Sequence, residues 1–380
     1  MKIFFPIGAF YPSQIGGPCN TLYWHTNELE KNNIKINIVT TTIGIKNGLV
    51  KKDIFYSSEC GNVYYGEGGI TRYKTILTAL RKIADNDIIH LNSIFNFLTI
   101  IVFLYIRLFH RNKPIVFSPR GELNLEAMLI NTWKKKPILF LYKQLYKGTL
   151  FHSTSDQETA DICFHFQKGK VVQIPNFIKP FKRIQEVEVK KELLYVGRIH
   201  PIKAIHKIIR GLSMSKSFLN SEFKFVLVGN YEGRYEYYYD ELCELIIEKN
   251  LQKKIEFKGH LTGYDKELIY AQSFATLLLS ETENFGNVVV ESLSQGTPVI
   301  TSKGTPWSIV EEYGCGFHID NTPLCIAETI DRFICKQKNE YELTRKNAIK
   351  LVEDKFNIEY QIHHWIREYN NIIQQRSIND

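Results

Sequence analysis

Two glutamates, eight positions apart, stand where the sequence predicts that a strand ends and a helix begins. The apolar run of the strand ends at Ser280, and Glu283 follows it in a loop. Glu291 falls one turn into the helix that opens near Asn287. A helix N-terminus exposes backbone N–H groups and the positive end of the helix dipole, which suits a phosphate or a polyhydroxylated ligand. The two carboxylates can therefore hold different parts of one ligand, although spacing alone is also typical of a helix with an acidic first turn.

Two cations occupy a second strand-to-helix turn. Arg198 follows a predicted strand, and Lys203 lies five residues on, behind Pro201, where a helix starts. Side chains placed in this way can converge on one pyrophosphate. The alternative is that both are solvated surface charges, as most lysines and arginines are.

A glycine pair follows the first predicted strand. Gly16 and Gly17 precede Pro18, and Asn20-Thr21 comes next. This pattern indicates a turn and the N-cap of a helix. Glycines at such a place also allow backbone N–H groups to approach a phosphate or a sugar closely.

Taken together and in this order, the segments resemble the retaining GT-B glycosyltransferases of family four. Glu283-x7-Glu291, with Phe285-Gly286 inside it and Gly296-x-Pro298 behind it, is similar to the Glu-x7-Glu signature of that family. The other segments that resemble the family are Gly16-Gly17-Pro18, Asp87-Ile-Ile-His90, Ser153-Thr-Ser155, Ile174-Pro175-Asn176, Tyr195-Val-Gly197-Arg198-x4-Lys203 and Gly259-His-Leu. The resemblance covers nearly the whole chain.

The resemblance implies a retaining hexosyltransferase (EC 2.4) whose donor is a nucleotide sugar. Its catalytic residues would be Glu283, Arg198 and Lys203, with the two cations on the diphosphate. Further donor-binding residues would be Gly16, Gly17, Phe285, Gly286, Asn287 and Glu291, the last on the ribose. Negative charge builds on the leaving oxygen, and cations and helix-end N–H groups can stabilise it. We therefore expect neither a metal nor another cofactor.

Two residues of the first half are candidates for contact with the acceptor or the sugar. Arg120 follows another predicted strand, where many family members carry a histidine. Its guanidinium could meet a phosphate of the donor or the acceptor, or it could be an exposed loop arginine. His90 ends a strand and could instead be a buried histidine with satisfied hydrogen bonds.

One acidic motif is expected to bind no metal. Asp85-Asn86-Asp87 has the form of the Asp-x-Asp motif that holds a divalent metal in the other major glycosyltransferase fold. That motif follows a strand, whereas this segment precedes one. We expect a polar loop here.

Alternating short apolar runs and longer amphipathic ones predict an α/β protein with parallel sheets. Strands are expected over residues 2–7, 36–40, 88–91, 114–117, 150–153 and 171–174, and then over 192–196, 223–228, 255–257, 275–279, 298–301 and 316–319. The rhythm restarts after Pro175, which favours two Rossmann-like domains facing one another across a cleft. We expect an acceptor domain over 1–178 and a nucleotide-sugar donor domain over 179–357. The resemblance implies that a last helix, within 358–380, crosses back to the first domain.

The charge is uneven along the 380 residues. Residues 1–180 contain 22 basic and 12 acidic residues, which gives +10, and the remainder, with 26 and 28, gives −2. This points to an anionic partner for the first half. Lys134-Lys135-Lys136, Lys143 and Lys147 lie on a predicted helix with Trp133 and Phe140, which is either a packed helix with a solvated basic face or a contact for anionic lipid. Nucleic-acid-binding motifs are absent from the sequence, so nucleic acid is not an expected partner.

The expected protein is cytoplasmic and peripheral at the inner face of the cytoplasmic membrane. Seven cysteines without a Cys-x-x-Cys pair favour reduced thiols and exclude a typical zinc site. The acceptor would be a glycan, lipid-linked, in bacterial O-antigen, lipopolysaccharide or capsule synthesis. A UDP-hexose or UDP-N-acetylhexosamine is the favoured donor, ahead of GDP-mannose. Two alternatives stay open: a nucleotide-sugar epimerase of GT-B-like fold, and a non-catalytic module that binds an anionic surface.

Overall fold

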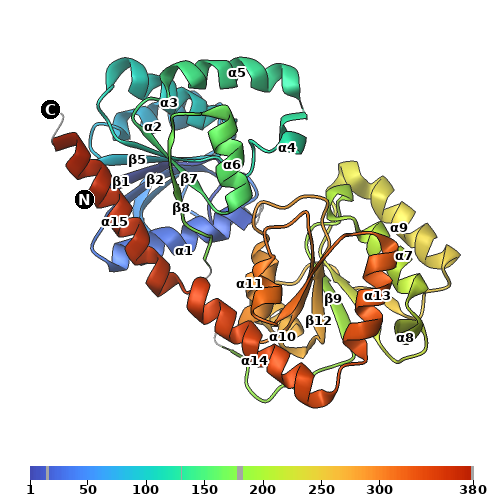
Figure 1. The fold of residues 1–380 in the computed structure, drawn as a ribbon. Coiled ribbons are helices and arrows are strands. Elements are labelled where there is room, and N and C mark those ends of the chain that lie inside the picture. Colours follow the sequence, from blue (N-terminus) through green and yellow to red (C-terminus); the bar gives the residue numbers. More distant parts are fainter. Residues whose placement is uncertain (14–16, 130, 178–182, 378–380) are drawn as a thin grey trace. The chain divides into compact units, whose positions relative to one another are not determined.

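The computed structural model describes residues 1–13, 17–129, 131–177 and 183–377. It divides into two compact units, Met1–Phe177 with Ile358–Asp380, and Ile178–Asn357. Each unit is a sheet covered by helices on both faces (Figure 1). The predicted α/β class with two parallel-sheet domains is confirmed.

The first unit contains an eight-stranded sheet in the order β3-β4-β2-β1-β5-β6-β7-β8. All neighbouring strands are parallel except β3 and β4. The strands are β1 (Lys2–Pro6), β2 (Lys35–Thr41), β3 (Phe55–Ser58), β4 (Gly61–Gly66), β5 (Ile88–Asn92), β6 (Ile115–Ser118), β7 (Thr149–Ser153) and β8 (Lys170–Gln173). The helices are α1 (Gly17–Lys31), α2 (Tyr73–Lys82), α3 (Phe97–Phe109), α4 (Leu125–Leu129), α5 (Thr132–Leu145) and α6 (Asp156–His165).

Alternate residues of the central strands serve two cores. Ile3 and Phe5 of β1 pack with α1 on one face, whereas Phe4, between them, packs with α3 on the other. Because side chains alternate across a strand, a strand buried on both faces is apolar throughout. That is why these strands could be recognised in the sequence.

The last helix, α15 (Ile358–Ser377), belongs to the first unit. Trp365 and Tyr369 are fully or almost fully buried in the same core as α1. The chain thus returns from the second unit to the first, as the resemblance implied.

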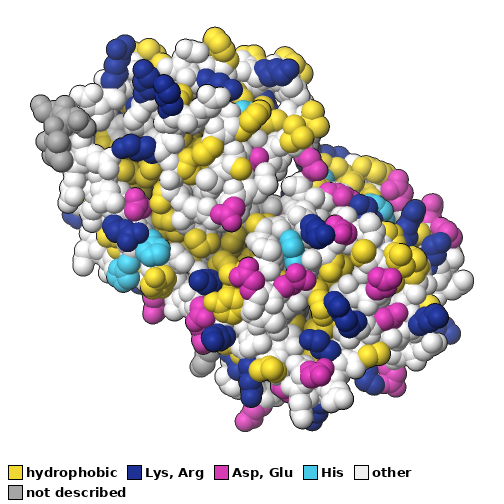
Figure 2. Space-filling view, in the orientation of Figure 1, with side chains coloured by type: hydrophobic (Ala, Val, Ile, Leu, Met, Phe, Trp, Pro, Cys, Tyr) yellow, Lys and Arg dark blue, Asp and Glu magenta, His cyan; other side chains and the backbone are white. Residues whose placement is uncertain are grey.

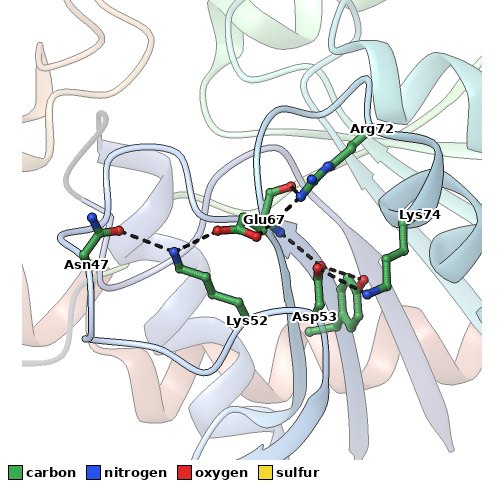
Figure 3. A network of polar contacts seen from close by, with 7 residues as sticks. Asn47, Lys52, Asp53, Glu67, Arg72 and Lys74 are labelled. Atoms are coloured by element: carbon green, nitrogen blue, oxygen red, sulfur yellow. Dashed lines mark hydrogen bonds and ion pairs between the residues drawn. The ribbon is translucent and has the colours of Figure 1, made fainter.

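A polar network ties together the segments that follow β2 and β4 (Figure 3). Lys52 pairs with Glu67 at 3.1 Å, and Lys74 pairs with Asp53 at 3.2 Å. Asp53 also accepts hydrogen bonds from the Tyr64 hydroxyl and the Glu67 backbone N–H. The network links the segments beside the β3–β4 hairpin to α2, and neither element is predicted from the sequence pattern.

The second unit is a six-stranded parallel sheet in the order β11-β10-β9-β12-β13-β14. Its strands are β9 (Glu192–Val196), β10 (Lys224–Val228), β11 (Ile255–Phe257), β12 (Ala275–Leu278), β13 (Val299–Ser302) and β14 (Gly316–Ile319). Its helices are η1 (Pro201–Lys203), α7 (Ile205–Met214), α8 (Lys216–Leu219), η2 (Gly233–Tyr235), α9 (Glu236–Glu248), α10 (Gly263–Gln272), α11 (Asn287–Ser294), α12 (Ile309–Glu312), α13 (Pro323–Ile334) and α14 (Lys338–Lys355). One core lies under α7, α9 and α13, and another lies under α11 and α14. The segments that follow β9 and β12 carry the predicted catalytic residues, Arg198 and Lys203 after β9 and Glu283 after β12.

Candidate active site

The loop between β12 and α11 is rigidly positioned at its end next to the helix. Gly286 adopts a left-handed conformation with φ +81°, and a Cβ there would lie 2.6 Å from a methyl of Leu278. Phe285 is buried against Trp307 and Phe356, and its carbonyl accepts a hydrogen bond from the Trp307 indole N–H. The Phe285 side chain therefore anchors the loop, while the backbone at Gly286 and Asn287 forms the start of α11.

The other end of the loop is held by two neighbouring turns. The Glu283 N–H donates to the carbonyl of Gly304 at 2.9 Å, and the Glu281 N–H donates to the carbonyl of Ile202 at 2.8 Å. A Cβ at Gly304 would lie 2.0 Å from the Glu281 carbonyl oxygen, so the close approach requires glycine. The Glu281 carboxylate also pairs with Lys207 of α7 at 2.6 Å. Glu283 is thus presented by a loop fixed to η1, α7 and the turn after β13.

Lys203 and Glu283 form an ion pair in this structure. Lys203 is the last residue of η1, and its side chain is 14% exposed, against 19% for Glu283. Ala204 follows in a left-handed conformation with φ +51°, which turns the chain from η1 into α7. The fold therefore brings together two predicted catalytic residues that are 80 positions apart in the sequence.

Arg198 lies apart from this ion pair. Its guanidinium is exposed and pairs with Glu232 at 3.4 Å. The turn that carries Arg198 is held by Tyr195 of β9, whose hydroxyl donates to the Arg198 carbonyl at 2.7 Å. An exposed ion pair contributes at most about 1 kcal/mol, so Arg198 can exchange Glu232 for a ligand phosphate at small cost.

Glu291 is buried in the second turn of α11 and has two partners on α10. The Tyr270 hydroxyl donates to its Oε2 at 2.9 Å, and the Lys266 ammonium lies 2.6 Å from the same oxygen. Burial and the charge of Glu291 raise the pKa of the Tyr270 hydroxyl well above its usual range, so Tyr270 is a permanent donor. Neither partner belongs to a recognisable sequence motif. Their four-residue spacing on a predicted helix, which places them on one face, was the available signal.

The glycine pair near the N-terminus is described only in part. Gly17 is the first residue of α1, and its carbonyl accepts from the Thr21 hydroxyl at 3.2 Å. Gly16 lies outside the described residues. The expected contact of these glycines with the donor stays a prediction.

His90 is part of a buried chain of hydrogen bonds. Its Nδ1 lies 2.7 Å from the Tyr369 hydroxyl, and its Nε2 lies 2.8 Å from Ser118 Oγ. Ser118 Oγ in turn lies 2.8 Å from Nδ1 of His152, which is also buried. His90 has no exposed surface, and both of its ring nitrogens are engaged. The structure therefore favours the interpretation of His90 as a satisfied core histidine that ties α15 to the sheet.

Arg120 lies at the carboxyl end of β6 and is partly exposed. Its guanidinium donates to the side-chain oxygens of Asn92 and Asn176 at 3.0 and 2.9 Å. This position leaves it available to a ligand, in contrast to His90. Over residues 1–13, 17–129, 131–177 and 183–377, no group of three or more His, Cys, Asp and Glu side chains is placed to hold a metal ion.

The fold matches solved structures of GT-B glycosyltransferases. The structure matches sucrose-phosphate synthase from Thermosynechococcus elongatus with a TM-score of 0.79 at 17% sequence identity, over 98% of this chain and 99% of that one. It matches HepE from Anabaena, in complex with UDP and glucose, with a TM-score of 0.77 at 16% identity, over 98% and 100% of the two chains. At such low sequence identities, these matches show a shared fold and nothing more.

Residues 177–351 match the family model of the glycosyl transferases group 1, so the chain carries a group 1 glycosyltransferase domain. An uncharacterized glycosyltransferase of Methanocaldococcus jannaschii is 26% identical over 234 residues, which are 57% of this chain and 58% of the relative. The O-antigen chain mannosyltransferase RfbU of Salmonella typhimurium is 25% identical over 156 residues, 41% and 42% of the two chains. The matched part of the chain thus spans roughly half the length of these relatives.

Proposed function

We propose that the chain is a retaining glycosyltransferase that moves a sugar from a nucleoside diphosphate sugar to a glycan acceptor. The observation that carries the proposal is the Lys203–Glu283 ion pair beside the N-terminus of α11, within a group 1 domain. A UDP-hexose or UDP-N-acetylhexosamine is the favoured donor, and the UDP and glucose bound by HepE support that choice. The acceptor is a lipid-linked glycan of a bacterial surface polysaccharide, in keeping with the O-antigen role in the name of RfbU.

The chemistry is the separation of a sugar from a diphosphate. Negative charge develops on the leaving oxygen, and Lys203, Arg198 and the N–H groups that open α11 are the groups that stabilise it. One such preorganised donor contributes about 3–4 kcal/mol to the transition state. When Lys203 turns towards the diphosphate, Glu283 is released to accept hydrogen bonds from the sugar hydroxyls. We propose same-face attack, in which a donor phosphate oxygen takes the acceptor proton, and no step uses a metal.

Glu291 would hold the ribose. Both of its contacts, to Lys266 and Tyr270, are made by Oε2. Oε1 is therefore the atom that would accept hydrogen bonds from the ribose hydroxyls. Lys266 and Tyr270 fix the orientation of the carboxylate, and Lys266 balances its charge.

A panel of nucleotide sugars, followed by thermal shift and by nucleoside diphosphate release, tests the function. We expect one donor to raise the melting temperature, and free nucleoside diphosphate to accumulate only when an acceptor extract is added. Nuclear magnetic resonance of the product should show the anomeric configuration of the donor. Release without acceptor, or interconversion of the donor sugar, would identify an epimerase instead. The absence of any nucleotide-dependent shift would leave only a binding module.

We propose further that α4 and α5 place the protein against an anionic membrane at the cytoplasmic face. Leu125, Leu129, Trp133 and Phe140 are exposed by 67 to 76%. Residues 123–150 contain five lysines, at 134, 135, 136, 143 and 147, and one acid, Glu126. Figure 2 shows Lys and Arg side chains beside hydrophobic ones over this part of the first unit. Exposed aromatic residues among lysines suit a bilayer surface with acidic headgroups.

Vesicle flotation tests the membrane proposal. We expect binding to vesicles with phosphatidylglycerol and not to pure phosphatidylcholine. Replacing Lys134, Lys136 and Lys143 by glutamine should weaken binding about a hundredfold, at roughly 1 kcal/mol for each lysine. Tyr237→Ser is the control, because Tyr237 is also an exposed aromatic residue but lies on α9 of the second unit, a helix that contains no lysine or arginine. Equal loss in the control variant and in Trp133→Ser would contradict the proposal. In the part of the chain that the structure describes, no helix has the length and apolar character needed to cross a membrane.

A further inference from the structure

One arginine at the carboxyl edge of the first sheet is held entirely by neutral groups. Nε of Arg120 donates to Oδ1 of Asn92 at 3.0 Å, and Nη1 donates to Oδ1 of Asn176 at 2.9 Å. Asn92 is the last residue of β5, Arg120 comes two residues after β6, and Asn176 follows β8. In open parallel sheets, ligands bind outside the carboxyl ends of the strands. The arginine therefore lies where a substrate is expected.

Arg120 has no acidic partner within the described residues. Arg72 and Arg198, by comparison, each pair with a glutamate. The Nη2 group of Arg120, with two N–H donors, makes no hydrogen bond in the described part of the chain. Two amide oxygens orient the guanidinium but cannot neutralise it. A guanidinium presents N–H donors in a planar fork that matches a phosphate or a carboxylate.

The two nearby acids are engaged with the backbone. Glu158 accepts from the Gly121 N–H at 2.7 Å and from the N–H and hydroxyl of Thr154 at 2.8 Å. Glu122 accepts from the Ser93 hydroxyl and from the Phe95 N–H. Both carboxylates therefore hold the loop that carries Arg120 and leave its charge unpaired.

The surroundings of Arg120 compensate its charge only in part. Burial lowers the pKa of Arg120 itself, and the charge of Glu158 opposes this change only in part. Burial, together with the nearby arginine, lowers the pKa values of His25, His90 and His152, so these rings are neutral at pH 7. Glu158 therefore acts on the guanidinium at a distance, without an ion pair between the two in the described part of the chain. A partly buried charge without an ion pair is costly, and an anionic ligand would reduce that cost.

The backbone at this position is strained. Arg120 adopts a left-handed conformation with φ +60°, which is energetically unfavourable for any residue other than glycine. Gly121 follows with φ +77°. Strain of this kind persists where the surroundings enforce it, and it is concentrated at functional sites. Glu158, through the Gly121 N–H, supplies that enforcement. Holding the guanidinium in this position therefore lowers the stability of the fold.

We propose that Arg120, oriented by Asn92 and Asn176, binds a phosphate group of the acceptor. The inference rests on the proposed function, because it takes the first unit as the acceptor side and Arg198 with Lys203 as the groups that meet the donor diphosphate. It adds the substrate class: the acceptor is a phosphate-bearing glycan or glycolipid. The second unit would then bind the sugar donor, and the first unit would bind the phosphate of the acceptor.

Inorganic phosphate is the first probe, because its binding requires no turnover. Isothermal calorimetry should show that Arg120→Gln weakens phosphate binding about 10- to 100-fold, the effect of one charge-assisted contact. Arg120→Lys, which keeps the charge but loses the fork, should give an intermediate affinity. Lys203→Ala should leave this site unchanged. Equal phosphate affinity in the wild type and in both Arg120 variants would overturn the proposal, as would loss confined to Lys203→Ala.

Steady-state kinetics then separates the two sources of phosphate. With a phosphate-bearing acceptor, Arg120→Gln should raise the acceptor KM and leave the donor KM unchanged. A raised donor KM with an unchanged acceptor KM would assign the phosphate to the donor and overturn the acceptor assignment. If the wild type transfers no sugar at all, the proposed function fails, while the calorimetric result on Arg120 still stands. Thermal unfolding of both Arg120 variants reports whether the loop remains folded.

Discussion

Replacing Lys203 by methionine removes the cation that faces Glu283 and keeps most of the side-chain volume. If Lys203 stabilises the leaving diphosphate, kcat should fall by about 10²–10³, which corresponds to about 3–4 kcal/mol. The structure supports this range because Lys203 is only 14% exposed, so water screens its charge weakly. Two unit charges 4 Å apart interact by about 4 kcal/mol in surroundings of intermediate polarity. The measurement is the initial rate of acceptor-dependent nucleoside diphosphate release.

The same substitution has a separate cost in stability. Breaking a fully buried ion pair costs about 3–5 kcal/mol and breaking an exposed one at most about 1 kcal/mol. The Lys203–Glu283 pair, with 14% and 19% exposure, lies between these limits. We therefore expect Lys203→Met to lower the free energy of unfolding by about 1–3 kcal/mol. Adding Glu283→Gln should restore much of that stability, because no unpaired carboxylate then remains, but it should not restore the rate.

Lys207→Met is the matched control. It removes the ion pair with Glu281 in the same loop, at 2.6 Å, without touching the groups that face the donor. We expect a change in kcat of less than about threefold and a loss of stability of about 1 kcal/mol or less. A folded Lys203→Met variant with the wild-type rate, or a double variant that regains the rate, would refute the reasoning.

Three further predictions concern the ribose carboxylate, a strained alanine and a buried histidine. Glu291→Gln should weaken UDP binding about 10- to 100-fold and leave binding of 2′,3′-dideoxy-UDP unchanged, as calorimetry can measure; equal losses would contradict the ribose role. Ala204→Gly should raise the free energy of unfolding by about 0.5–1 kcal/mol, because glycine adopts φ +51° without a Cβ clash. Urea unfolding measures this change, and a less stable variant would contradict the prediction. Burial, then the charge of Arg120, lowers the pKa of His152 from 6.5 to about 3. The unfolded chain therefore takes up a proton near pH 6.5 that the folded chain refuses until about pH 3, and this histidine stabilises the fold fully only above pH 6.5. Urea unfolding between pH 7 and 5 should show stability falling below that pH, by about 1.4 kcal/mol per pH unit for this one group; His152→Gln should reduce the slope.

The strands that position the candidate site could be read from the sequence because they are buried on both faces. Runs such as the one that became β9 are apolar throughout, which is typical of parallel sheets. The β3–β4 hairpin gave no such signal, because β3 is only partly buried and β4 is a short run that begins and ends at a glycine. Helix α14 was missed for a related reason. Its buried positions include Thr344 and Arg345, so its inward face is not apolar by residue type.

The candidate site itself could be predicted as a set of residues but not as a set of contacts. Lys203 and Glu283 were expected near one ligand because of a family resemblance, and their direct ion pair depends on the parallel pairing of β9 with β12. His90 was ambiguous because its hydrogen-bond partner, Tyr369, is 279 positions away on the returning helix. Lys266 and Tyr270 were overlooked because a lysine and a tyrosine on a surface helix carry no distinctive local pattern. Contacts of this kind are set by tertiary packing, which single-sequence periodicity does not encode.

The basic residues of the first 180 positions include two groups whose charges act in different ways. Lys134, Lys136 and Lys143 of α5 are exposed and have almost no acids near them in the sequence, so their charge acts at a surface. Arg120 is partly buried, oriented by two amides and unpaired among the described residues, so its charge acts on one group at short range. Salt should therefore distinguish them, since exposed charges are screened over about 8–10 Å at 0.1–0.15 M ionic strength, whereas buried contacts are screened much less. Raising the salt concentration from 0.05 to 0.5 M should release the protein from acidic vesicles while sugar transfer to a water-soluble phosphorylated acceptor changes little; parallel loss of both would show that one cationic surface serves both purposes.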